Sequence, residues 1–155
     1  AVALRFTYRG PTDTDAKLAS GEVRRQVGLK LRAQNSCNLV YVMWRIYPKP
    51  GLEVQVKRNP GAKTNEDCGV GGYTKVKPKK KKSLALLEKD VEPTLAAYID
   101  GDDLVASIDG AMVWRGRLPK AARDLFGPAG IRSDNVTFDG ELLADGDFTA
   151  PPKCD

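Results

Sequence analysis

Apolar and polar residues alternate along most of this chain with a period of two, which is typical of half-buried β-strands. In the segment 22–34 the alternation predicts an apolar face with Val27, Leu29, Leu31 and Ala33, and a polar face with Lys30, Arg32 and Gln34. The segment 38–47, NLVYVMWRIY, carries apolar bulk on both faces. A strand that is apolar on both faces is covered on both sides, so this one is predicted to lie centrally in its sheet.

The later segments repeat the strand pattern in shorter units. Residues 52–57 alternate, and residues 94–116 read as three short strands joined by two tight turns of the Asp-Gly kind. Residues 119–126, PKAARDLF, are the one segment that favours a helix, about two turns long. Two further strands are expected in residues 127–140, GPAGIRSDNVTFDG, at the end of the pattern.

Roughly eight to ten short strands at ordinary turn spacing predict an all-β fold, a two-sheet antiparallel β-sandwich with at most one short helix. The length of 155 residues suits a single domain over residues 1–155, and no linker divides it. Between about residues 59 and 83 the chain is rich in Gly, Pro, Lys and Asn, which predicts a long lysine-rich loop with a short strand near residues 72–74.

Composition agrees with a globular protein, because 41% of the residues are hydrophobic and 29% are charged. No apolar run approaches the length of a membrane span. The formal charge of +5 is unevenly distributed, since residues 75–82 hold six lysines. This run is either a solvated loop or a contact for a polyanion such as nucleic acid, an acidic polysaccharide or a membrane surface. It contains no aromatic residue to stack on bases, which argues against a sequence-specific nucleic-acid reader.

The chain has three cysteines and no histidine, so it lacks the usual ligand set of a structural zinc site. Cys37 and Cys68 flank a hairpin-like region and are candidates for a disulfide, which would suit an exported protein. Cys154 is then left over. Pairing of Cys154 with either of the other two remains open at this stage.

Three motifs, taken in order, resemble the concanavalin A-like jelly-roll domains of the laminin-G and DUF1080 type. VGLKLRAQNSCNLVYVMWR resembles their paired strands, and LAAYIDGDDLVASIDGAMVW resembles the strand, turn and strand that follow. GIRSDNVTFD resembles their closing strands. Together the motifs cover most of residues 22–140. The resemblance supports the sandwich more than any one activity, because such folds carry lectins, lyases, hydrolases and adhesion modules.

The resemblance implies three readings of the Arg132-Ser133-Asp134-Asn135 segment. In the first, Arg132 and Asn135 fix neighbouring loops by hydrogen bonds and Phe138 returns to the core. In the second, Asp134 or Asp139 is a calcium ligand, since related sandwiches bind Ca²⁺ through loop oxygens. In the third, Arg132 or Asn135 contacts a sugar directly.

Catalytic patterns are weak. Residues 88–92 alternate three carboxylates, as laminarinase-type jelly rolls do, and a retaining glycosidase needs two such groups about 5 Å apart. However, Lys89 stands where that family has an apolar residue, and Pro93 follows at once. Without histidine there is no Ser-His-Asp or Cys-His arrangement. No catalytic residue is assigned.

The favoured ligand surface is the sheet face opposite the core. An aromatic ring flanked by Arg, Lys and Gln is a common means of holding sugar rings and acidic glycans. Alternation predicts this set on that face: Lys30, Arg32, Tyr41, Arg45, Gln55, Lys57 and Tyr98. The alternative is that the face is polar only because it meets water.

These observations predict a carbohydrate-binding or adhesion module without catalytic activity, which is secreted, periplasmic or held at the cell surface. Its expected partner is a glycan, with basic residues favouring an acidic polysaccharide. Calcium is the cofactor that the resemblance allows. Two alternatives stay open: a glycoside hydrolase or related sugar-active enzyme, and a structural subunit that associates with itself or with a parent protein.

Overall fold

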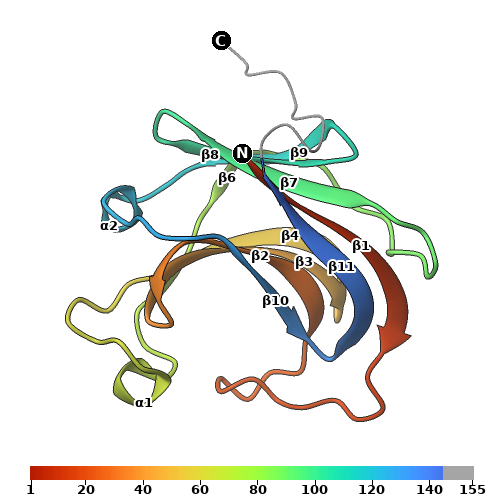
Figure 1. The fold of residues 1–155 in the computed structure, drawn as a ribbon, viewed down its shortest axis with the longest axis horizontal. Coiled ribbons are helices and arrows are strands. Elements are labelled where there is room, and N and C mark those ends of the chain that lie inside the picture. Colours follow the sequence, from red (N-terminus) through yellow and green to blue (C-terminus); the bar gives the residue numbers. More distant parts are fainter. Residues whose placement is uncertain (145–155) are drawn as a thin grey trace.

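The computed structural model describes residues 1–144 and is an all-β, two-sheet antiparallel sandwich compatible with a jelly roll (Figure 1). One sheet has six strands in the order β11-β1-β7-β8-β9-β6. Their bounds are Val136–Ala144 (β11), Val2–Pro11 (β1), Thr94–Asp100 (β7), Asp103–Ile108 (β8), Ala111–Arg117 (β9) and Pro78–Lys81 (β6). The predicted fold class is confirmed.

The second sheet has five strands in the order β10-β2-β3-β4-β5. Their bounds are Gly130–Asp134 (β10), Arg25–Asn35 (β2), Asn38–Tyr47 (β3), Gly51–Lys57 (β4) and Tyr73–Lys75 (β5). Strand β3 is the middle strand, as its two apolar faces predict. None of the helices within residues 1–144 is long and apolar enough to cross a membrane.

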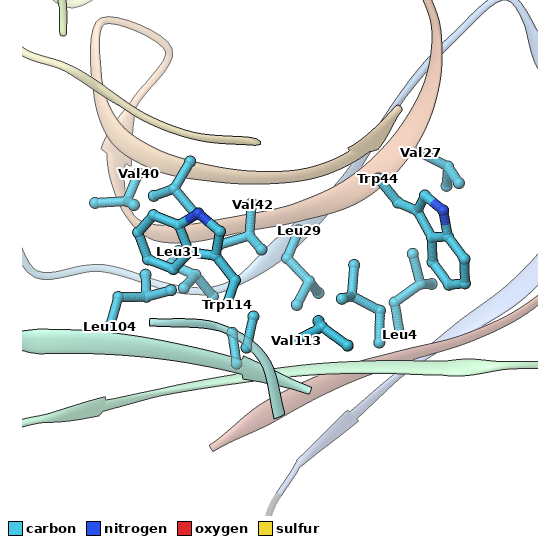
Figure 2. Packing of buried hydrophobic residues seen from close by; sticks show 14 of the residues in the cluster. Leu4, Val27, Leu29, Leu31, Val40, Val42, Trp44, Leu104, Val113 and Trp114 are labelled. Atoms are coloured by element: carbon cyan, nitrogen blue, oxygen red, sulfur yellow. The ribbon is translucent and has the colours of Figure 1, made fainter. Parts of the chain in front are cut away.

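The core fills the space between the two sheets (Figure 2). Trp44 from β3 lies near Val27 and Leu4, and Trp114 from β9 lies at the other end of the cluster near Val40 and Leu104. Both indoles are almost fully buried. The ring of Trp44 meets the ring of Phe6 edge-on, with 5.8 Å between centroids, an arrangement that aromatic pairs favour.

Strands β7, β8 and β9 form the consecutive antiparallel hairpins that the Asp-Gly turns predict. At the second turn Asp109 and Gly110 both have positive φ, 51° and 85°. Two consecutive positive φ values define the tight turn whose twist matches paired strands, and Asp followed by Gly adopts them at low cost.

The segment 59–83 contains more regular structure than the sequence predicts. It holds a short helix α1, Asn65–Cys68, and strands β5 and β6. With α2, Lys120–Arg123, the described residues contain two short helices instead of at most one. Most of the lysine run therefore lies on two short edge strands, β5 and β6, and not in a free loop.

Strand β2 changes face near its end. Arg32 has a φ of 49°, and the register with β3 shifts between Leu31 and Asn35. A residue in the left-handed region breaks the alternation, as in a β-bulge. As a result Ala33 does not continue the core face of Leu31 and packs against Leu39, Tyr41 and Met43 on the opposite side of the sheet.

The closing motif is divided between the two sheets. Strand β10 joins the five-stranded sheet beside β2, and β11 joins the six-stranded sheet beside β1. Asn135 lies between them with a φ of 58°, in the left-handed region that Asn tolerates better than most residues. Phe138 packs against the core, as the resemblance implies.

Candidate functional site

A groove of about 760 Å³ lies on the outer face of the five-stranded sheet, within the size range of ligand sites. In Figure 1 this sheet arches away from the six-stranded sheet, with the loop before β2 and the α1 segment below it. These two segments contribute Lys17 and Leu18 on one side and Asn65 and Val70 on the other. The sheet itself contributes Gln26, Lys30, Tyr41, Met43, Glu53, Gln55, Lys57, Tyr73, Arg132, Ser133 and Asp134.

The strand register sets which groove side chains are neighbours. One cross-strand row runs Gly130, Lys30, Tyr41, Gln55, Lys75 across all five strands. The next row runs Arg132, Gly28, Met43, Glu53, and a third runs Asp134, Gln26, Arg45, Gly51. Cross-strand partners on one face have Cβ atoms about 5 Å apart. Basic, amide and aromatic side chains are therefore interleaved along the groove.

The groove contains a stacked pair of tyrosines, each with a cation near its ring. The rings of Tyr41 and Tyr73 are nearly parallel, with centroids 6.2 Å apart. The Arg132 guanidinium lies 4.6 Å from the Tyr41 centroid, and the Lys57 ammonium lies 5.0 Å from the Tyr73 centroid. Both distances are within the range of cation–π attraction. Tyr41 is 7% exposed and Tyr73 is 38% exposed, so Tyr73 is the ring that a ligand can reach.

The pKa of Tyr41 is raised to about 12, chiefly by burial and also by the neighbouring Tyr73, whereas Arg132 opposes this rise. Desolvation disfavours the charged form of a phenol, so Tyr41 stays neutral at physiological pH. A neutral phenol is a hydrogen-bonding group and a poor general base at that pH.

A buried carboxylate organises the floor of the groove beside the tyrosines. The side chain of Glu53 is 5% exposed and accepts hydrogen bonds from Arg45 at 2.7 Å and from Gln55 Nε2 at 2.6 Å. Arg24 approaches the same carboxylate at 3.4 Å. A buried carboxylate needs such partners to offset its desolvation. Glu53 therefore holds Arg45 and Gln55 in fixed orientations.

A second carboxylate, Asp134, stands on β10. Gln26 Nε2 donates to Asp134 at 2.8 Å, and Arg132 Nε donates to the same oxygen at 3.2 Å. The other amide atom of Gln26, Oε1, is buried and has no hydrogen-bond partner. Asp134 thus anchors the base of the Arg132 side chain, whose guanidinium covers Tyr41.

Asn135 fixes the loop that borders one side of the groove. Its Oδ1 accepts a hydrogen bond from the Ala16 backbone at 2.7 Å, and its Nδ2 donates to the carbonyls of Ala16 and Arg24 at 2.9 and 2.8 Å. Arg25 adds a bidentate pair with Asp15 in the same loop. This loop-fixing role of Asn135 is the first of the three readings that the resemblance implies.

The α1 segment, on the other side of the groove, is attached to the sheet by a disulfide and by a network of hydrogen bonds around Asn38. Cys37 and Cys68 are bonded, as the sequence predicts. The buried side chain of Asn38 donates to the carbonyls of Asn59 and Ala62 and accepts from Arg58 and from the backbone of Asn59. Lys57 Nζ donates to the Gly69 carbonyl at 2.8 Å. Cys154 lies outside the described residues.

Of the seven ligand-face residues that alternation predicts, four line the groove: Lys30, Tyr41, Gln55 and Lys57. Arg45 lies next to it and pairs with Glu53. Arg32 and Tyr98 lie elsewhere. The bulge turns Arg32 toward α2, where it donates to the carbonyls of Ala122 and Arg123, and Tyr98 belongs to β7 in the six-stranded sheet.

The two predicted calcium ligands are not brought together. Asp134 is on β10 and Asp139 is on β11, in different sheets, and Asp139 pairs with Arg9 at 2.9 Å. Residues 1–144 contain no group of three or more His, Cys, Asp or Glu side chains placed to hold a metal ion.

The carboxylate motif at residues 88–92 does not form a strand. The segment lies between β6 and β7, and Asp90 has a φ of 64° and pairs with Arg9. Without a strand, its carboxylates do not share one face.

Gln26, Glu53 and Tyr73 are among the groove residues that the sequence analysis did not select. Gln26 and Glu53 could have been predicted from alternation. Gln26 is four residues before Lys30 and Glu53 is two residues before Gln55, which places each pair on the same face of its strand. Tyr73 lies in the short strand expected near residues 72–74, which the structure shows as β5, but this segment is too short for an alternation that would assign the ring to a face. Comparison with protein-family models finds none that matches this chain, and comparison with curated proteins finds no similar one.

Proposed function

We propose that this chain is a non-catalytic carbohydrate-binding module of the concanavalin A-like jelly-roll type, and that it holds a glycan chain in the groove. The observation that carries the proposal is the reachable ring of Tyr73 next to Lys57 and close to Lys30, Gln55 and Arg132. A sugar offers an apolar ring face and a rim of hydroxyl groups, which match an aromatic surface flanked by amide and cationic donors.

The groove is pre-organised, which favours binding. Glu53 orients Arg45 and Gln55, Asp134 anchors Arg132, and Asn135 and the disulfide hold the two bordering segments. Side chains that are already ordered lose less conformational entropy when a ligand arrives. Lys30 and the exposed part of the Tyr73 ring are then the contacts that a sugar could engage first.

The hydrolase alternative is less well supported. The groove carboxylates with fixed positions, Glu53 and Asp134, are on β4 and β10, with β2 and β3 between them. Three strand spacings amount to about 14 Å, whereas glycosidases place their carboxyl pair about 5–9.5 Å apart. Each carboxylate is also engaged by an arginine, which is a poor setting for a general acid.

An exported location belongs to the same proposal. The disulfide is of a kind that persists in oxidising compartments such as the periplasm, the cell surface and the extracellular medium. Glycans are abundant ligands at those sites. We therefore propose a secreted, periplasmic or surface-held module.

The test is retention on a glycan array, with calcium and with a chelator, for the wild-type protein and two double variants. The groove variant Lys30→Ala/Tyr73→Ala removes one lysine and one reachable ring from the site. The control variant Lys120→Ala/Tyr47→Ala removes one lysine and one exposed ring that do not line the groove. We expect retention of a glycan class to fall at least about tenfold in the groove variant and to persist in the control.

Equal retention by the two variants would reject the groove as the site. A blank array for the wild-type protein would reject carbohydrate binding and favour the structural-subunit alternative. Loss of retention in chelator would show that calcium takes part.

A further inference from the structure

The lysine run extends from the rim of the groove to the far edge of the sandwich. It begins at Lys75, the last residue of β5, whose ammonium is 4.0 Å from Glu53 in the groove. It continues into β6 at the edge of the six-stranded sheet. Figure 1 shows this chain rising from the α1 side of the five-stranded sheet to the other sheet. At about 3.3 Å per residue, residues 75–82 span about 23 Å.

The backbone of this path is ordered while most of its side chains are exposed. Val76 is buried and its N–H donates to the Val54 carbonyl at 2.9 Å, and the N–H of Lys82 donates to Val113 at 2.8 Å. Between them, β6 pairs with β9. Lys75, Lys77, Lys80, Lys81 and Lys82 are exposed on this fixed backbone. We define the lysine edge as residues 75–82.

Arginine and lysine are used differently in this chain. Within residues 1–144 every arginine except Arg32 is paired with a carboxylate. By contrast, no ion pair joins Lys77, Lys80, Lys81 or Lys82 to a described carboxylate; Lys79, which pairs with Asp103, is the exception on β6. The excess charge of +5 is therefore carried by lysines, and the lysine edge is their densest cluster.

The groove continues this positive surface. Lys30 is partly exposed and lines the groove without a described carboxylate partner, whereas Lys57, on the strand next to β5, is buried below it and its ammonium donates to the Gly69 carbonyl. Edge lysines also discourage strands from pairing with other chains. That role concerns the edge strands alone, whereas these lysines form a path that reaches from β6 to the rim of the groove at Lys75.

We propose that the groove and the lysine edge form one continuous contact for a long acidic polysaccharide, whose carboxylate or sulfate groups bind along the lysines. This inference rests on the proposed glycan function and names its substrate class. A polyanion that neutralises several lysines releases its condensed counterions, which gives affinity that depends on chain length and on salt. Nucleic acid fits less well, because the proposed contact offers one reachable ring, Tyr73 in the groove, and no aromatic side chain along the lysine edge on which successive bases could stack.

The test compares affinities by biolayer interferometry over a range of salt concentrations. The probes are a galacturonate trisaccharide, polygalacturonate, dextran sulfate, neutral dextran and double-stranded DNA. The edge variant is Lys80→Ala/Lys82→Ala, and the matched control is Lys89→Ala/Lys120→Ala, which removes the same charge from lysines elsewhere that have no ion pair within residues 1–144. The groove variant Lys30→Ala/Tyr73→Ala is measured alongside.

We expect the edge variant to bind polygalacturonate about fivefold more weakly and with a shallower salt dependence, and to bind the trisaccharide as the wild-type protein does. If the edge variant weakens the binding of dextran sulfate and not that of polygalacturonate, sulfate is the anion that the lysine edge recognises. Equal losses in the edge and control variants would overturn the lysine edge while leaving the groove function standing.

Two further outcomes separate the inference from the function on which it rests. Loss of polygalacturonate binding in the edge variant but not in the groove variant would reject the groove and keep the edge. Tighter binding of DNA than of either acidic polysaccharide would overturn the assignment of the partner. Binding of neutral dextran as tight as that of dextran sulfate would show that charge is not what the protein recognises.

Discussion

Arg132 covers the ring of Tyr41 at 4.6 Å although the two residues stand on strands that are not neighbours. Strand β2 runs between them, and the β2 residue in register with Arg132 is Gly28. Because Gly28 has no side chain, the guanidinium can lie across β2 and reach the tyrosine on β3. The contact places a cation over a buried ring in the groove, which is an arrangement that cation–π attraction stabilises.

Gly28→Ala is expected to destabilise the protein by about 1–3 kcal/mol. An added Cβ would collide with the carbonyl oxygen of Val42 and would lie 2.8 Å from the Cα of Met43. Both are backbone atoms of the central strand and cannot move aside. The matched control is Gly51→Ala, since a Cβ at Gly51 meets nothing within 4 Å. Urea unfolding measures both variants, and equal stabilities would contradict the proposed close approach of β2 and β3.

In an absorbance titration at alkaline pH, the Tyr41 phenol should ionise with a pKa of about 12. Its pKa in the unfolded chain is about 10. The folded pKa is the higher one, so the stability associated with neutral Tyr41 is complete below pH 10 and is lost as the pH rises toward 12. Tyr41→Phe should remove the ionisation step near pH 12, whereas Tyr47→Phe, at an exposed ring, should keep that step. Persistence of the step in Tyr41→Phe would contradict the assignment.

Asp103 should contribute a pH-dependent share of the stability. A hydrogen bond from Lys79, together with one from Arg115, holds the pKa of Asp103 below its usual value, although burial opposes this. Since the folded pKa is the lower one, this stability is present above about pH 4 and is lost as the pH falls below it. Asp103→Asn should therefore lower the free energy of unfolding at pH 7 and flatten its dependence on pH below 4.

Urea unfolding at a series of pH values measures the Asp103 effect. Asp102→Asn serves as the control, because the Asp102 carboxylate is 49% exposed and its ion pairs are longer, at 3.3 and 3.6 Å. If Asp102→Asn changes the pH dependence of the unfolding free energy as much as Asp103→Asn does, the ion pairs of Asp103 do not contribute more than those of an exposed carboxylate.

Removal of the disulfide should weaken both the fold and the groove. The bond joins residues separated by 31 positions and fixes α1 against the turn between β2 and β3. Cys37→Ser/Cys68→Ser is expected to cost about 2–4 kcal/mol of stability. Glycan affinity should fall as well, because Asn65, Gly69 and Val70 of the groove border lie in the segment that is released.

Reductant provides the matched comparison for the disulfide. It should lower the melting temperature and the glycan affinity of the wild-type protein and leave the double-serine variant unchanged. An affinity that is insensitive to both treatments would show that the α1 segment does not shape the site.

Local sequence signals predicted the strands whose burial is regular. The apolar residues on both faces of 38–47 predicted the central strand, and the Asp-Gly pairs predicted two turns, because these features depend on neighbours along the chain. Helix α1 was missed, although Thr64 and Asp67 form a capping box that a motif search would detect. The four residues of α1 are too few for a helical period.

The sequence by itself determined the sandwich class, the disulfide candidates and four residues of the groove, since alternation records which face of a strand is buried. Only the tertiary structure decided the rest. Arg132 meets Tyr41, Tyr73 stacks on Tyr41, and Asn135 holds a loop more than a hundred residues away in sequence. Such contacts depend on sheet order and on bulges such as that at Arg32, and a pattern of period two carries no information about which distant strands become neighbours.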